Sequence, residues 1–131
     1  MRTALDSSVV LLLQRRQPGW ETWRDKLTLA ASEGPLLINP VVFAECSAGF
    51  PTAEIALREF ESIQIHYDPI SADSAYLAGQ SFLRYRREGG PRNHLIPDFL
   101  VAAHASLQAE RLAALDRGYL RRYFQALKLL T

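Results

Sequence analysis

The chain has 131 residues, of which 48% are hydrophobic and 22% are charged, and its formal net charge is +1. This length fits one compact domain over residues 1–131, and the composition is ordinary for a globular protein with one sizeable core. The small net charge excludes nucleic-acid binding through a bulk positive field, so such binding would need a local basic patch. The single cysteine, Cys46, excludes an internal disulfide and a thiolate metal cluster, and it indicates a reducing compartment.

The first half of the chain alternates short apolar runs with helix-start signals. The N-terminal apolar run ends at Leu13 and is too short to span a membrane, so we expect a cytoplasmic protein without a membrane anchor. The predicted elements are a strand ending near Asp6, a helix from about Ser8, a helix over Trp20 to Ser32, a strand over Leu36 to Ile38, a helix capped by Asn39 and opened by Pro40, and a helix over Thr52 to Ser62.

The second half continues the alternation. Its predicted elements are a strand over Ile63 to Tyr67, a long helix capped by Ser71 or Asp73 with the apolar face Ala75, Ala78, Phe82 and Tyr85, a helix opened by Pro97, a strand over Arg111 to Leu115, a short basic-aromatic segment over Arg121 to Phe124, and a final strand or tail over Leu127 to Leu130. Strands that alternate with helices indicate the α/β class, with a mostly parallel central sheet of four to five strands flanked by helices.

The predicted helix after Pro97 carries a charge at the start of an otherwise apolar segment. From Phe99 to Gln108 nearly every position is apolar or small, which is typical of a helix packed inside a domain. Asp98 lies in its first turn, and an ionised group there needs a partner: the helix N-terminus, a cation or a metal.

Three further carboxylates fall at comparable places in the predicted fold. Asp6 and Asp116 follow apolar strands, and Glu45 lies near the start of an apolar helix. Ligands of an open α/β sheet bind outside the carboxyl ends of its strands, so the four acidic side chains could share one rim of the sheet. Clustered carboxylates repel one another unless a cation is present, and oxygen ligands are those that Mg²⁺ or Mn²⁺ prefers. Such ions activate water for attack on a phosphodiester.

Each carboxylate also has a purely structural interpretation. Asp6 could cap a helix, Glu45 could be a salt-bridged or half-exposed helix residue, Asp98 could pair with the helix dipole, and Asp116 could be a turn residue. Taken singly none of the four is persuasive, but their joint placement favours a metal site.

Four spaced segments resemble one family. They are Leu5-Asp6-Ser7-Ser8-Val9, Asn39-Pro40-Val41-Val42-Phe43-Ala44-Glu45, Ile96-Pro97-Asp98-Phe99-Leu100-Val101-Ala102-Ala103-His104-Ala105 and Leu115-Asp116-Arg117-Gly118-Tyr119-Leu120-Arg121-Arg122-Tyr123-Phe124. Together they resemble the PIN domain, and more narrowly the VapC toxins of bacterial and archaeal toxin–antitoxin pairs. The resemblance covers essentially the whole chain in the right order, and it is more specific for a PIN domain than for a toxin.

The resemblance implies a three-layer PIN-like fold and Mg²⁺- or Mn²⁺-dependent endonucleolytic cleavage of RNA, giving 5′-phosphate and 3′-hydroxyl products. It implies Asp6, Glu45, Asp98 and Asp116 as the acidic quartet, with Asp6 and Asp98 as the principal metal ligands. One departure is Ala114, where many family members have Thr or Ser that hydrogen-bonds within the site. This departure bears on the local geometry of Asp116 or on a second metal.

Other polar residues offer weaker signals. Ser7 and Ser8 are expected to cap the helix or to support the metal ligands by hydrogen bonds, since no nucleophile motif surrounds them. Arg87, Arg92, Arg117 and Arg121 are candidates for holding RNA phosphates, although a basic helix end is an equal explanation for the arginines from 84 to 87. His104 is expected in the core or an interface, and His94 is only a weak candidate for substrate contact.

The partners follow from the same argument. The apolar side chains on the helices that begin at Trp20 and Thr52 exceed what one small core needs, so we expect a homodimer and a groove for an antitoxin helix. A non-catalytic PIN-fold module that binds RNA or protein is the alternative. A phospho-acceptor receiver domain is disfavoured because Asp6 has no acidic neighbour and the only lysines are Lys26 and Lys128.

Overall fold

Five short parallel strands form the centre of the protein in the computed structural model, which describes residues 1–116 and 118–131. The strands are β1 (Thr3–Leu5), β2 (Leu36–Ile38), β3 (Ile65–Tyr67), β4 (Arg111–Ala113) and β5 (Lys128–Leu129). Their order across the sheet is β3-β2-β1-β4-β5, and each of the four neighbouring pairs is parallel. The α/β class and the predicted parallel sheet are therefore confirmed.

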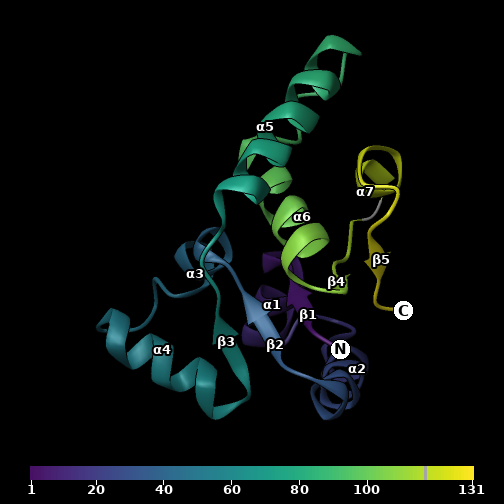
Figure 1. The fold of residues 1–131 in the computed structure, drawn as a ribbon. Coiled ribbons are helices and arrows are strands. Elements are labelled where there is room, and N and C mark those ends of the chain that lie inside the picture. Colours follow the sequence, from purple (N-terminus) through teal and green to yellow (C-terminus); the bar gives the residue numbers. More distant parts are fainter. Residues whose placement is uncertain (117) are drawn as a thin grey trace.

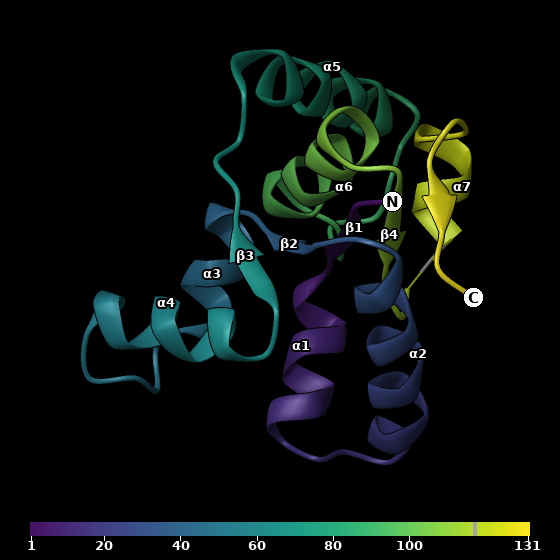
Figure 2. The same ribbon diagram turned by 60° about the horizontal axis from the view of Figure 1, so that its bottom comes forward.

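Helices cover the sheet on both faces. They are α1 (Ser7–Gln14), α2 (Trp20–Glu33), α3 (Pro40–Cys46), α4 (Ala53–Ser62), α5 (Ala72–Arg87), α6 (Ile96–Gln108) and α7 (Gly118–Tyr123). Figure 2 shows α5 and α6 on one side of the strands and α1 and α2 on the other, which gives three layers. In Figure 1, α7 lies beside β5 at the sheet edge opposite β3 and α4.

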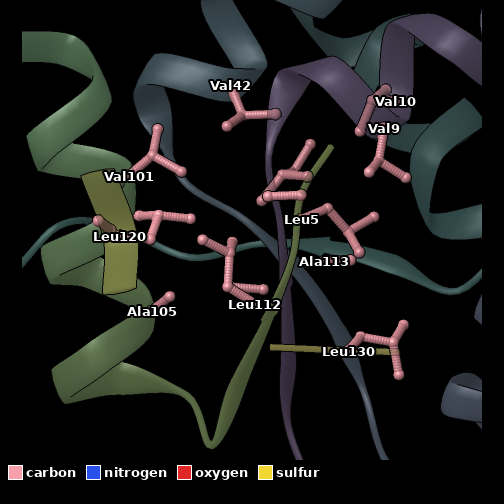
Figure 3. Packing of buried hydrophobic residues seen from close by; sticks show 14 of the residues in the cluster. Leu5, Val9, Val10, Val42, Val101, Ala105, Leu112, Ala113, Leu120 and Leu130 are labelled. Carbon is pink, nitrogen blue, oxygen red and sulfur yellow. The ribbon is translucent and has the colours of Figure 1, made fainter. Parts of the chain in front are cut away.

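The strands are buried on both faces, as in sheets covered by helices. Leu5 and Leu112 are fully buried on adjacent strands, and Val9, Val42 and Val101 belong to the same core from three different helices. Figure 3 shows these side chains meeting around the strands. This packing fixes where the helices begin relative to the strand ends, and therefore where the polar residues at those ends lie.

The apolar helix α6 is buried along most of its length, as predicted. Phe99 and the run from Val101 to Ala105 are buried, and within this run the side chain of His104 is fully inaccessible. His104 Nε2 lies 2.8 Å from Asp68 Oδ2, and Gln108 Nε2 donates to the same carboxylate oxygen at 3.2 Å. The prediction of a core histidine is confirmed, because this ring joins α6 to the segment after β3.

Three local predictions were wrong. The third strand begins at Ile65 and not at Ile63, because Gln64 has a φ of 66° and turns the chain out of α4. Ala75 is exposed, and the buried face of α5 instead carries Ser74, Ala78, Ser81 and Tyr85. The strand predicted over Arg111 to Leu115 ends at Ala113.

Within the residues that the structure describes, no helix is both long and apolar enough to cross a membrane.

Candidate functional site

The sheet topology places a ligand-binding crevice between β1 and β4. These strands are neighbours, but the chain leaves β1 toward β2 on one side and leaves β4 toward β5 on the other. In open α/β sheets, such a switch point is where ligands bind, outside the carboxyl ends of the strands. Asp6 directly follows β1, and Asp116 follows β4 after two intervening residues. The Asp6 N–H donates to the Ala113 carbonyl at 2.9 Å, which ties the two strand ends together.

Asp6 caps α1, as its position before two serines predicted. Its Oδ2 accepts hydrogen bonds from the Ser8 N–H at 3.3 Å and from the Ser8 hydroxyl. Ser8 Oγ in turn accepts from the Leu115 N–H at 3.2 Å, next to Asp116. Ser8 therefore links the end of β1 to the segment that carries Asp116, and it supports Asp6 by hydrogen bonds as expected.

Glu45 approaches the same crevice from α3. Asn39 caps this helix by accepting from the N–H groups of Val41 and Val42, and Pro40 is its first residue. Ser7 Oγ donates to Glu45 Oε1 at 3.3 Å, so the first residue of α1 holds the carboxylate of α3. Both serines therefore contact members of the acidic quartet.

Asp98 lies in the first turn of α6. Its Oδ2 accepts from the Leu95 N–H at 2.9 Å, which satisfies a backbone donor before the helix begins. Its side chain is 41% exposed, so it faces the solvent side of the buried helix. Asp98 can therefore satisfy the start of α6 and still present its carboxylate to a ligand.

His94 lies between Asp98 and Asp116. Its Nδ1 is 3.7 Å from Asp98 Oδ2 and its Nε2 is 3.4 Å from Asp116 Oδ2. Its ring stacks on Tyr119 with 4.1 Å between ring centroids and 29° between ring planes. Sequence reasoning treated His94 as a minor residue and missed Tyr119. The available signals were the four-residue spacing of His94 from Asp98 and the three-residue spacing of Tyr119 from Asp116.

The pKa shifts show that the carboxylates act on one another. Burial raises the pKa of Asp6, hydrogen bonds from Ser8 oppose that rise, and the charge of Asp98 adds to it. Burial also raises the pKa of Glu45, the Ser7 hydrogen bond opposes this, and Asp6 and Asp98 add to it. The pKa of Tyr119 is raised by burial and then by the charges of Asp6, Asp98 and Asp116. Negative charge is therefore concentrated at the end of β1 and the start of α6.

The donor set suits a hydrated divalent cation better than a closed metal cage. Among the described residues, no three His, Cys, Asp or Glu side chains converge to enclose a metal ion. Mg²⁺ usually keeps several waters and is bound through one or two carboxylates, so it does not need such a cage. A cation of this kind would stabilise these carboxylates, because they are partly buried and repel one another.

The proposed phosphate-binding arginines belong to different segments of the chain. Arg87 is in the last turn of α5, Arg92 is in the loop before α6, and Arg121 is in α7, and all three are exposed. Arg117 lies outside the described residues. Cys46 is buried, and burial, with the nearby charges of Glu45 and Asp6, raises the pKa of its thiol to about 12, consistent with a small packed side chain.

Comparisons with known proteins identify the fold and the family. The sequence is 35% identical over 115 residues to Ribonuclease VapC10 of Mycobacterium tuberculosis (strain CDC 1551 / Oshkosh), covering 86% of this chain and 80% of the relative. The fold is similar to a chain of VapBC2 from Rickettsia felis bound to a DNA fragment from its promoter, with a TM-score of 0.76, 19% identity and 98% and 97% of the two chains covered. It is also similar to Mycobacterium tuberculosis VapC20, a sarcin–ricin loop cleaving toxin, with a TM-score of 0.63, 18% identity and 96% and 98% coverage. The family model of the PIN domain matches residues 3–125, and the chain therefore belongs to the PIN domain family.

Proposed function

We propose that this protein is a Mg²⁺- or Mn²⁺-dependent endoribonuclease and the VapC-type toxin of a toxin–antitoxin pair. The observation that carries the proposal is that the charge of Asp98 acts on both Asp6 and Glu45 at the switch point of a PIN-domain sheet. The name of the VapC10 relative supports RNA as the substrate. Since RNA is a cytoplasmic substrate, we place the activity in the cytoplasm.

In this proposal Asp6 and Asp98 are the principal metal ligands, and Glu45 and Asp116 complete the anionic site directly or through water. Divalent cations held by carboxylates activate water and stabilise the charge that develops on a phosphodiester. Ser8 and Ser7 orient Asp6 and Glu45 by hydrogen bonds. The capping contacts of Asp6 and Asp98 fix both carboxylates at helix starts, so little reorganisation is needed when a cation enters.

RNA would reach this centre with help from basic side chains around it. Arg92 precedes His94 by two residues and Arg121 follows Tyr119 by two residues in α7, so both belong to segments that border the carboxylates. We propose that these two arginines, together with Arg117 and with Arg87 at the end of α5, bind phosphates that flank the scissile one.

The proposed antitoxin site is an apolar groove of about 830 Å³. It is lined by α1 and α2 and by the turn from α4 into β3, with Leu13, Trp20, Leu27 and Ile63 among its residues. Arg16 and Arg24 lie over the Trp20 ring with 5.1 Å and 5.2 Å to its centroid. An amphipathic antitoxin helix with apolar anchors and acidic flanking residues fits this lining.

The catalytic proposal is tested by incubating single-stranded RNA with the purified protein and Mn²⁺. Cleavage should be lost in Asp6→Ala and Asp98→Ala, while the far-UV circular dichroism of both variants stays that of the wild type. Cleavage that persists in both variants, or wild-type protein that does not cleave with Mn²⁺, would favour the non-catalytic module instead.

The partner proposal is tested by co-expression with the products of the adjacent reading frames. Trp20→Ala should weaken the complex in size-exclusion chromatography with light scattering, because it removes the ring on which both arginines rest. Leu29→Ala is the matched control, since Leu29 is on the same helix, is 65% exposed and does not line the groove. The same experiment reports the oligomeric state, for which we propose a homodimer.

A further inference from the structure

His94 is placed to control the geometry of the fourth carboxylate of the site. We infer that His94, held from behind by Tyr119, is a positioning residue that keeps Asp116 beside Asp98 in the arrangement that a divalent cation requires. The inference rests on the proposed function, because it gives a role to a side chain within that metal site. It concerns how the site is built, and it adds no ligand to it.

Asp116 depends on such support more than Asp98 does. Asp98 is inside α6 and its carboxylate is anchored on the Leu95 N–H. Asp116 follows the end of β4 in a non-helical segment, and its side chain is 63% exposed. The described residues give it two contacts on separate oxygens: the Gly118 N–H donates to Oδ1 at 3.3 Å, and His94 Nε2 lies 3.4 Å from Oδ2. Either contact alone would leave the carboxylate free to rotate, but the two together restrict this rotation.

The His94 ring is itself held by two aromatic contacts. One face stacks on Tyr119, and the ring meets Tyr85 nearly edge-on, with 6.1 Å between centroids and 74° between planes. The Tyr85 hydroxyl donates to the Pro91 carbonyl, which holds the loop that carries His94. Only 15% of the His94 side chain is exposed. A ring held in this way keeps its two nitrogens pointing at the two carboxylates.

The orientation of the ring separates this role from simple packing. A histidine that only filled space against Tyr119 could present either nitrogen to solvent, but here Nδ1 faces Asp98 and Nε2 faces Asp116. Tyr119 comes just after Asp116 in the chain, at the start of α7, and its hydroxyl lies 3.5 Å from the backbone carbonyl of Asp98. Residues that hold metal ligands in this manner typically contribute about 10–100-fold to metal affinity or activity.

The experiment measures Mn²⁺ binding by isothermal titration calorimetry in the absence of RNA, followed by RNA cleavage at increasing Mn²⁺ concentration. His94→Ala should raise the dissociation constant for Mn²⁺ by about ten-fold or more. It should lower kcat at limiting Mn²⁺ while leaving KM for RNA unchanged, and excess Mn²⁺ should restore kcat. His94→Gln, which keeps a polar group that can reach a carboxylate, should recover part of the affinity.

Three further variants test the mechanism. His66→Ala is the control, because His66 is an exposed histidine on β3 and should bind Mn²⁺ as the wild type does. Tyr119→Phe keeps the ring that supports His94 and should change Mn²⁺ affinity little. Tyr119→Ala removes that ring and should reproduce the His94→Ala effect. Circular dichroism and thermal unfolding identify any variant that has lost its fold.

The outcomes separate the inference from the proposed function. If the wild type binds Mn²⁺ and cleaves RNA but folded His94→Ala does so with the same constants, the positioning role is wrong and the nuclease proposal stands. If folded His94→Ala binds Mn²⁺ more tightly, the ring competes with the cation and the positioning role is again wrong. If the wild type neither binds Mn²⁺ nor cleaves RNA, both proposals are overturned.

Discussion

Replacing Asp6 by Asn separates the two tasks that we assign to this residue. Asp6 caps α1, and Asn is as good an N-cap as Asp, so the variant keeps the helix start. The replacement removes the negative charge, which is required only for metal binding. We therefore expect Asp6→Asn to lose RNA cleavage without losing stability in metal-free buffer.

The direction of the stability change follows from the pKa of Asp6, which burial raises from its ordinary value of 3.8. A raised pKa means that the folded protein binds the proton more tightly than the unfolded chain does. The resulting stabilisation is present at pH values below the unfolded pKa and is lost as pH rises through the folded pKa. At neutral pH the ionised carboxylate thus costs about 1.4 kcal/mol for each unit of the shift, and Asp6→Asn removes this cost.

Asp6→Ala provides the matched comparison. It also removes the charge, but it loses the cap, which contributes about 0.5–2 kcal/mol. Urea unfolding at neutral pH in EDTA should therefore rank Asp6→Asn as equal to or more stable than the wild type, with Asp6→Ala less stable than Asp6→Asn by about the value of the cap. Adding Mn²⁺ at about 100 times its dissociation constant should stabilise the wild type by about 2.7 kcal/mol and neither variant.

Two results would refute this reasoning. If Asp6→Asn unfolds more easily than the wild type in EDTA, the charge of Asp6 supports the fold and the burial argument is wrong. If Asp6→Asn gains the full Mn²⁺ stabilisation of the wild type, Asp6 is not a metal ligand.

Three other predictions concern Asp98, His104 and Trp20. Asp98→Asn should keep the contact with the Leu95 N–H and unfold within about 1 kcal/mol of the wild type, whereas Asp98→Ala should lose about 0.5–2 kcal/mol more, and neither should cleave RNA. Burial lowers the pKa of His104, so stability should fall as pH drops below about 6.5, and urea unfolding of His104→Gln should show a smaller loss. Trp20→Ala should cleave RNA at the wild-type rate in the absence of antitoxin and resist inhibition by it, because Trp20 lines the groove and not the carboxylate site.

The fold could be predicted well from the sequence because its signals are local. Asn39-Pro40 and the apolar run Leu36 to Ile38 specify a helix start and a buried strand without reference to the rest of the chain, and both are found where expected. The errors arose where tertiary packing decides. Ala75 has the right spacing for the buried face of α5, but Ser74 is buried in its place because its hydroxyl donates to Gln108 of α6 at 2.8 Å.

The sequence predicted the carboxylates of the site but not the residues that hold them in place. The carboxylates Asp6 and Asp98 stand out because each is polar beside an apolar run, whereas the contacts that hold Asp116 involve residues from two segments far apart in the sequence. His94 and Tyr119 meet only because α7 folds back toward the loop before α6. No periodicity or motif links them, so their pairing requires the structure.

The structural and catalytic interpretations of Asp6 and Asp98 are complementary. Each carboxylate occupies a helix start, Asp6 before α1 and Asp98 in the first turn of α6, where the partial positive charge of the helix N-terminus favours an anion. Two helix ends therefore offset part of the mutual repulsion between the carboxylates before any cation binds. The backbone contacts that satisfy the helix ends also fix the orientation of both side chains. This arrangement lets a small domain hold interacting negative charges at the edge of its sheet. A bound cation would then neutralise the charge that the helix N-termini offset only in part.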